Sequence, residues 1–128
     1  MFSSAKVDIL TDASGDATVY LTHGENRKFN GFLMLLKYTP GTINTAATLT
    51  ITGESSGNPI IVKTNAGTSV VFYYPRALAN AVASPGAAVA GTTEYIPIKD
   101  ERIKVVVASG GVTKAGSIEA IIMTQSPY

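Results

Sequence analysis

The chain is dominated by short segments in which apolar and polar residues alternate, separated by residues that favour turns. In the stretch ATLTITG, Leu49 and Ile51 alternate with three threonines. A period of two is typical of a strand with one buried face. Segments of this kind recur at spacings typical of β-sandwiches and barrels. We predict strands at 6–11, 17–22, 30–39, 47–53, 59–64, 69–74, 93–98, 101–108 and 117–123.

The connections between these segments carry turn chemistry. Glycine adopts a positive φ without steric cost, and Asn or Asp tolerates it, so such residues favour chain reversals between antiparallel strands. We interpret SGGVTKAG as a hairpin loop, because it has the glycines of a turn and lacks the spacing of a phosphate-binding loop. The predicted turns are DASGD at 12–16, GESSGNP at 53–59, NAG at 65–67 and SGGVTKAG at 109–116.

One segment departs from the strand pattern. Residues 75–91, PRALANAVASPGAAVAG, are rich in alanine and poor in strand formers. We expect a long loop there, with at most a short helical turn in its first part, because Pro85 and Gly86 end any helix. No repeat or linker composition divides the chain. Residues 1–128 are therefore predicted to form a single all-β domain, a two-sheet antiparallel β-sandwich of jelly-roll-like type with one long Ala-rich loop.

Two strand segments, GFLMLLKY and SVVFYY, are apolar on both faces. This is typical of a central strand, or of a strand whose outer face meets another subunit, and both interpretations stay open. Since only one face of a strand can point into a two-layer core, we expect the chain to form a homo-oligomer. The side chains that we expect to share the core are Leu49, Ile51, Val70, Phe72, Ile103, Val105, Ile118 and Ile122.

Composition excludes several classes of function. The net charge is +1 and no basic stripe is present, so we expect no nucleic-acid binding. The chain has no cysteine, which removes thiol chemistry. No apolar run approaches the roughly 20 residues that span a bilayer, and no signal segment is visible, so we expect no membrane association. Charged residues make up only 15% of the chain, a low share that indicates a surface partly covered by a partner.

The candidates for catalysis are weak. The cluster KDER, residues 99–102, is expected at the hydrated reversal of a hairpin, with Arg102 paired to Glu94 or Asp100. His23 lies alone in a polar loop, without the partners of an oriented triad. Asp12 and Asp16 lack the ligand series of a calcium loop. We therefore predict a protein that is not an enzyme, with no catalytic residues, no cofactor and no metal site.

The stretch YYPR at 73–76 is the best candidate for an interaction site. Tyrosine and arginine are enriched at protein interfaces, and strand alternation must either expose one of the two rings or bury it against a partner. We predict Tyr73, Tyr74 and Arg76 as interface residues. The alternatives are that one tyrosine packs in the core while the other caps the sheet edge, and that Arg76 binds carbonyls within its own loop.

Four stretches, taken in order, resemble small virion structural proteins of tailed bacteriophages, most of all capsid decoration (cement) proteins. They span most of the chain from Val7 to Ile122, and the Ala-rich segment 75–91 has no counterpart in the family pattern. The features that carry the resemblance are TDASGDA after the first strand, the ITGESSG turn, the PR after an aromatic strand and the stretch ERIKVVVASGGVTKAG.

The resemblance implies a β-sandwich that binds the outside of a capsid shell at the junctions between capsomers. The major capsid protein would be its partner, and the assembly would be a symmetric homo-oligomer, a trimer more readily than a dimer. Such a protein is made in the host cytoplasm and ends on the capsid exterior, and the family carries no catalytic residues. Two other functions stay open: a head-to-tail or tail structural component, and a carbohydrate-binding β-sandwich. The absence of tryptophan speaks against the last.

Overall fold

The computed structural model describes residues 2–25, 27–80 and 88–124, which contain strands and no helix. The strands are β1 (Phe2–Leu10), β2 (Ala17–Leu21), β3 (Phe29–Thr39), β4 (Thr48–Gly53), β5 (Pro59–Lys63), β6 (Val71–Tyr73), β7 (Arg76–Asn80), β8 (Ala88–Glu101), β9 (Ile103–Ala108) and β10 (Ala115–Met123).

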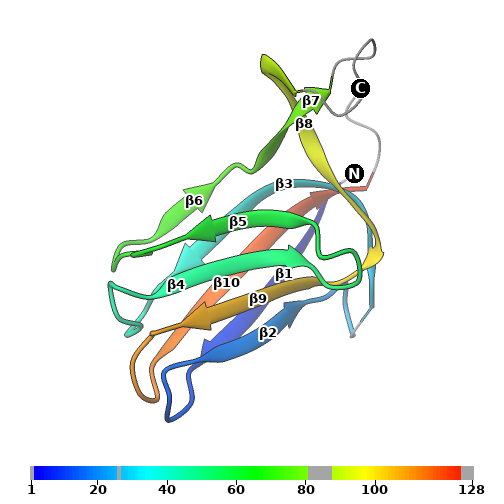
Figure 1. The fold of residues 1–128 in the computed structure, drawn as a ribbon. Coiled ribbons are helices and arrows are strands. Elements are labelled where there is room, and N and C mark those ends of the chain that lie inside the picture. Colours follow the sequence, from blue (N-terminus) through cyan, green and yellow to red (C-terminus); the bar gives the residue numbers. More distant parts are fainter. Residues whose placement is uncertain (1, 26, 81–87, 125–128) are drawn as a thin grey trace.

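The strands form two antiparallel sheets. The six-stranded sheet has the order β1-β10-β3-β8-β7, with β6 pairing β3 as well, and the four-stranded sheet has the order β2-β9-β4-β5. The strands of the four-stranded sheet lie across one face of the larger sheet (Figure 1). The prediction of an all-β chain with two antiparallel sheets is confirmed.

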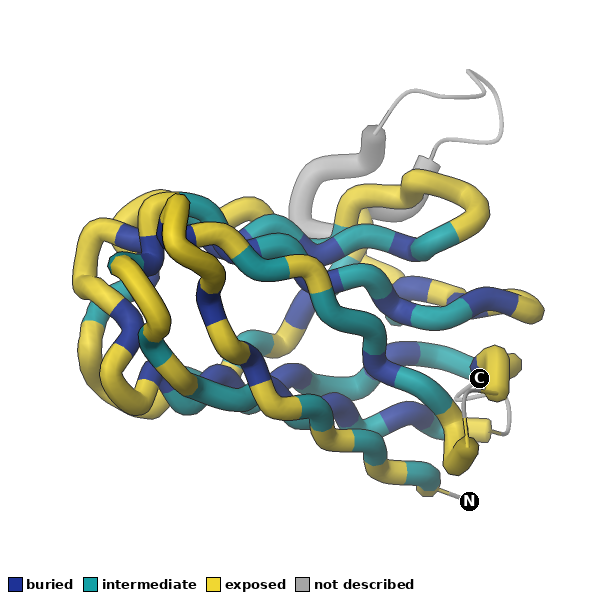
Figure 2. The backbone as a smooth tube through the Cα atoms, turned by 90° about the horizontal axis from the view of Figure 1, so that it is seen from below, coloured by how far each residue is buried: buried dark blue, intermediate teal, exposed yellow. Residues whose placement is uncertain are grey.

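The core lies between the inner faces of the two sheets. Burial alternates along the strands, as Figure 2 shows, because successive side chains point to opposite faces. The predicted core is confirmed for six residues and wrong for two: Val70 and Phe72 are 50% and 52% exposed. Val71 and Tyr73 are the β6 residues opposite Tyr38 and Leu36, so the alternation turns Phe72 outward. The confirmed core residues are Leu49, Ile51, Ile103, Val105, Ile118 and Ile122.

A β-bulge lets β3 bury both Leu33 and Leu36. Ile122 lies opposite Leu33 while Ile121 lies opposite Leu35, so Met34 is an extra residue in this strand. An extra residue shifts the alternation by one, and Leu33 and Leu36 therefore both point into the core although they are three positions apart. The same shift places Phe32 and Leu35 together on the outer face.

The interpretation of SGGVTKAG as a hairpin loop is wrong. It joins β9 to β10, which belong to different sheets. At this end of the sandwich the loop packs on the turn DASGD, where the Gly110 N–H donates to the Gly15 carbonyl at 2.7 Å. A Cβ on Gly15 would lie 3.0 Å from the Gly111 nitrogen. Turn residues indicate a reversal of the chain, and they do not distinguish a hairpin from a crossing between sheets.

The expectation of a loop throughout 75–91 is also wrong where the structure describes this segment. Residues 76–80 form β7 and residues 88–91 begin β8, while 81–87 lie outside the described residues. Arg76 lies opposite Tyr95, and the β7–β8 hairpin extends beyond the sandwich body (Figure 1). Alanine is a poor strand former, but pairing between two segments outweighs so small a propensity difference.

Candidate functional site

The outer face of the six-stranded sheet carries a cluster of apolar side chains. Phe2, Met123, Phe32 and Pro97 lie opposite one another across β1, β10, β3 and β8. The next row contains Ile121 and Leu35. Phe72 lies on β6 and Tyr74 just beyond its end, and both are more than half exposed. We call this set the outer apolar patch: Phe2, Phe32, Leu35, Phe72, Tyr74, Pro97, Ile121 and Met123.

A charged row borders the outer apolar patch. Lys6, Glu119, Lys37 and Phe72 lie opposite one another across β1, β10, β3 and β6. The ammonium nitrogen of Lys37 lies 5.8 Å from the centre of the Phe72 ring, within the range of a cation–π contact. Lys6, Lys37 and Glu119 line a shallow open depression together with Thr39 and Ser117. This face therefore offers alternating charges beside exposed aromatic rings.

The structure separates the three predicted interface residues. The Tyr74 side chain is 62% exposed, whereas Tyr73 packs against the core. Among the described residues, the buried hydroxyls of Tyr73 and Tyr38 have no hydrogen-bond partner. Burial raises the pKa of both phenols, and the nearby Tyr73 raises that of Tyr38 further. Of the two rings, only that of Tyr74 is therefore available to a partner without rearrangement.

Arg76 is held within its own chain. Its Nη1 donates to the Met34 carbonyl at 3.0 Å and to the Pro75 carbonyl at 2.7 Å. Its guanidinium lies 4.1 Å from the centre of the Tyr95 ring. The alternative that Arg76 binds carbonyls of its own loop thus describes one of the two bonds. The other reaches the β3 bulge and fastens the base of the β7–β8 hairpin to the sheet.

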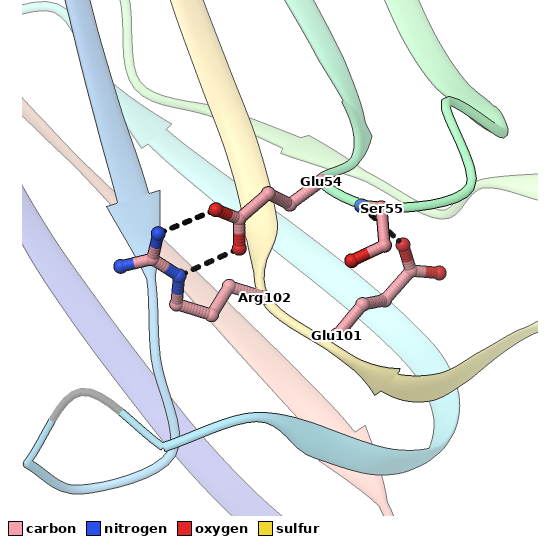
Figure 3. A network of polar contacts seen from close by, with 4 residues as sticks. All are labelled: Glu54, Ser55, Glu101 and Arg102. Atoms are coloured by element: carbon pink, nitrogen blue, oxygen red, sulfur yellow. Dashed lines mark hydrogen bonds and ion pairs between the residues drawn. The ribbon is translucent and has the colours of Figure 1, made fainter.

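The KDER cluster is not a hydrated hairpin reversal. β8 continues to Glu101, and Arg102 lies at the crossing to β9 in the other sheet. Only 5% of Glu101 is exposed. Its Oε1 accepts a hydrogen bond from the Ser55 N–H at 3.0 Å (Figure 3). The same oxygen accepts from the Ser56 N–H, and Oε2 accepts from the Ser56 hydroxyl, both at 3.0 Å. All three of these hydrogen bonds come from the β4–β5 turn, so the carboxylate holds that turn.

The expected pairing of Arg102 with Glu94 or Asp100 is wrong. Arg102 instead makes a bidentate ion pair with Glu54, on the β4–β5 turn (Figure 3), and its guanidinium lies 4.2 Å from the centre of the Tyr20 ring. The hydrogen bond from Arg102 lowers the pKa of Glu54, and the same bond raises the pKa of Arg102. The ion pair therefore joins the β8–β9 crossing to the β4–β5 turn. These two segments are distant in sequence, and the local pattern did not predict their contact.

The remaining polar candidates also have structural partners. The Ser3 hydroxyl lies 3.0 Å from Nδ1 of the exposed His23, and no ion pair joins that ring to an acidic side chain within the described residues. Asp12 Oδ1 accepts the N–H groups of Ser14 and Asp16, and these bonds lower the pKa of Asp12. The described residues contain no group of three or more His, Cys, Asp or Glu side chains placed to hold a metal ion.

Sequence reasoning missed most of the outer apolar patch. The apolar character of GFLMLLKY on both faces was visible, but the partners Phe2, Met123 and Pro97 lie far away in sequence and meet Phe32 only through the strand order. The signal that could have found them is weak. Phe2 and Met123 each occupy the outward position of a strand that is otherwise regular in its alternation.

No protein-family model matches the chain, and no curated protein matches its sequence. In the part of the chain that the structure describes, no helix is long and apolar enough to cross a membrane.

Proposed function

We propose that this chain is a non-enzymatic structural protein of a bacteriophage virion, which decorates and stabilises the capsid shell at the junctions between capsomers. The observation that carries the proposal is the outer apolar patch. Phe2, Phe72 and Tyr74 are each more than half exposed, and clustered exposed apolar side chains usually mark an interaction surface. Polar side chains such as Glu101 and Arg102 serve instead to hold turns in place.

The strand order supports a jelly-roll assignment. The orders β1-β10-β3-β8 and β2-β9-β4-β5 interleave strands from the two ends of the chain in both sheets. Interleaving of this kind is expected when one long antiparallel ribbon folds over as a double Greek key, and that architecture is common in viral capsid proteins and in lectins. The assignment therefore agrees with the resemblance to virion proteins, and it also keeps the carbohydrate-binding alternative open.

Binding through an apolar sheet face suits a protein that strengthens a shell. A partner that binds the assembled shell and not its separate subunits stabilises the assembly by mass action. Several copies bound at one junction multiply this effect, because each further contact is made at high effective concentration. We therefore propose a homo-oligomer, a trimer or a dimer, on the capsid exterior, with the major capsid protein as its partner.

Carbohydrate binding is the second candidate, and the polar depression favours it. Lys6, Lys37 and Glu119 offer hydrogen-bonding groups beside the exposed rings of Phe72 and Tyr74, and sugar sites commonly combine these two features. A head-to-tail or tail component remains the third candidate. It uses the same kind of apolar contact, and only the location of the chain in the particle distinguishes it.

The experiment is a binding assay with capsid shells assembled without this protein. We expect the native chain to co-sediment with such shells, and Phe72→Ser with Tyr74→Ser to lose binding while keeping its melting temperature. The matched control is Val62→Ser, which removes an equally exposed apolar side chain from β5 in the four-stranded sheet. Electron microscopy then locates the chain on the shell or in the tail. Glycan binding without shell binding would refute the decoration proposal.

A further inference from the structure

The first strand is an unprotected sheet edge. All nine residues of β1 pair with β10 without a register shift, and within the described residues no strand pairs with its other side. Native proteins usually shorten, bend or interrupt such an edge, because its free N–H and C=O groups can pair with another chain. The segment FSSAKVDIL contains no Pro or Gly. Its protection against pairing is limited to two exposed charged side chains, Lys6 and Asp8.

The other edges are short or irregular. At the opposite edge of the same sheet, β7 has five residues, and its pairing with β8 shifts register between Leu78 and Asn80. β5 begins with Pro59, which has no N–H group, and its pairing with β4 shifts register between Ile51 and Thr52. β2 has five residues and β6 only three. By contrast, β1 is long, regular and free, which are the properties that permit addition of a further strand.

The register identifies which backbone groups of β1 point outward. The Thr11 N–H donates to the Lys114 carbonyl at 2.9 Å, in the register that runs through the whole β1–β10 pair. Ala115, which lies opposite Leu10, points the other way: its carbonyl accepts from the Thr42 N–H, on the side of β10 away from β1. Since these directions alternate along an antiparallel strand, the odd residues of β1 bond to β10. The free edge therefore presents the N–H and C=O groups of Phe2, Ser4, Lys6, Asp8 and Leu10.

We propose that this edge pairs antiparallel with β1 of a second copy of the chain, about a two-fold axis at Val7. A two-fold pairing must set even residues opposite even residues, because only these have outward-pointing groups. An axis at Lys6 or at Asp8 would oppose like charges, which destabilises a strand pair. An axis at Val7 sets each Lys6 opposite the partner's Asp8, so the charge contact forms twice, and every outward group from Ser4 to Leu10 gains a bond.

The inner side of the edge fits the same pairing. Ala5 and Val7 on β1, and Ala17 and Val19 on β2, are only half buried although they pack against the core. They line the side of the sandwich where these two strands are near neighbours. Pairing about Val7 places the two Val7 side chains against each other and sets Ala5 opposite the partner's Ile9. The second copy would therefore cover apolar surface that a monomer leaves half exposed.

The pairing refines the homo-oligomer part of the proposed function and does not depend on the shell. A contact between identical surfaces is isologous and relates two copies. Of the two oligomers named above, it therefore favours the dimer over the trimer. The axis is perpendicular to the joined sheet, because two antiparallel strands in one sheet are related in that way. Both outer apolar patches consequently lie on one side of the dimer and form one wider docking face.

The experiment uses charge reversal along the edge, followed by light scattering and sedimentation of the full chain at low salt. We expect the native chain to dimerise, and Lys6→Asp and Asp8→Lys each to weaken the dimer by about tenfold or more, since both symmetry-related contacts become repulsive. The double reversal should restore the dimer. A mixture of the two single variants should form a heterodimer, because a chain with two acidic side chains at these positions then meets a chain with two basic ones.

Matched controls exclude a general charge effect and unfolding. Lys37→Asp makes the same change beside Glu119 but on a central strand, so it should leave the dimer intact. Ser4→Pro removes an outward N–H that β10 does not use, and should abolish the dimer while keeping a cooperative melt. In the native chain, the amide protons of Ser4, Lys6, Asp8 and Leu10 should exchange faster on dilution.

Three results would overturn the inference. One is a monomer at every concentration with unprotected even amides in β1. Another is a dimer that the charge reversals leave unchanged. Loss of dimerisation in Phe72→Ser with Tyr74→Ser, but not in Lys6→Asp, would also count against it and place the contact on the outer apolar patch. A charge-sensitive dimer that ignores capsid shells would refute the proposed function and leave the edge pairing standing.

Discussion

Replacement of Glu101 tests the finding that the KDER cluster is structural. The side chain is 5% exposed and accepts three hydrogen bonds from Ser55 and Ser56. Gly53 lies directly beside it, where a Cβ would come within 2.6 Å of Glu101 Oε1. The carboxylate thus ties the end of β8 in one sheet to the β4–β5 turn of the other, and Glu101→Ala removes the whole link.

The expected cost of Glu101→Ala follows from these contacts. Hydrogen bonds to a charged group contribute about 1.5–3 kcal/mol each. The loss of stability in Glu101→Ala should be smaller than the sum of three such bonds. Ser55 and Ser56 are exposed, so water can accept the hydrogen bonds that the carboxylate no longer accepts. The carboxylate also regains its full hydration on unfolding, which offsets part of the gain. We therefore expect a loss of about 2–4 kcal/mol in the free energy of unfolding. Glu101→Gln keeps one acceptor oxygen and should cost about 1 kcal/mol.

Urea unfolding followed by far-ultraviolet circular dichroism measures this loss as a fall in midpoint at constant slope. Lys99→Ala, an exposed neighbour on β8, is the control and should change the midpoint little. A Cβ on Gly53 would also come within 2.6 Å of the Ser56 hydroxyl, so the cost of Gly53→Ala should shrink in the Glu101→Ala background without disappearing. A loss below about 0.5 kcal/mol for Glu101→Ala, the size of an ordinary surface substitution, would refute the claim that this carboxylate holds the turn.

Three further predictions use other parts of the fold. Ile103→Ala should cost about 2–5 kcal/mol in urea unfolding, because that side chain is fully buried, whereas Phe72→Ala should cost under about 1 kcal/mol; equal losses would contradict the placement of Phe72 on the outer face. Arg76→Lys should lose about 1–2 kcal/mol, since lysine cannot both bind the Met34 carbonyl and stack as a planar group, and an unchanged midpoint would show that this anchor is dispensable. The hydrogen bond from Arg102 lowers the pKa of Glu54 in the folded state from an ordinary value of 4.5. The ion pair therefore adds to the free energy of unfolding above that pH, and this addition is lost as the pH falls below it. Acid titration of stability should therefore be shallower in Glu54→Gln, and an identical profile would argue against the ion pair.

Local pattern predicted the strands well because alternation is a property of each segment. The strand that includes Leu49 and Ile51 needs no distant information, and its buried face is as expected. β7 was missed because its alanines carry little strand preference, and its pairing with β8 is a contact between separate segments. Phe72 was assigned to the wrong face because SVVFYY is apolar on both faces, so the pattern does not show which face is buried; the pairing of β6 with β3 decides it.

The candidate site was harder to predict, since its residues are brought together by the strand order. Tyr74 was identified by residue type, and its exposure agrees with an interface role without testing it. Arg76 was identified for the same reason, but its contact with Met34 depends on a bulge that leaves no local mark in the sequence. Glu101 and Arg102 were expected in solvent, because charges between two apolar segments resemble a hairpin turn. Their partners on the β4–β5 turn become visible only once the two sheets are stacked.

The two proposals, edge pairing through β1 and docking through the outer apolar patch, rest on a common energetic argument. A side chain such as Phe72, which is 52% exposed, adds little to the stability of the monomer, and polar residues there would improve solubility. Likewise, the free groups on β1 cost nothing while water binds them, yet they add a risk of unwanted pairing. Neither feature is needed to fold the sandwich, whose core is already closed by residues such as Ile103 and Ile118. The two surfaces are also separate, one at the edge of the sheet and one on its face, so pairing through β1 leaves the outer apolar patch free to dock on a second partner.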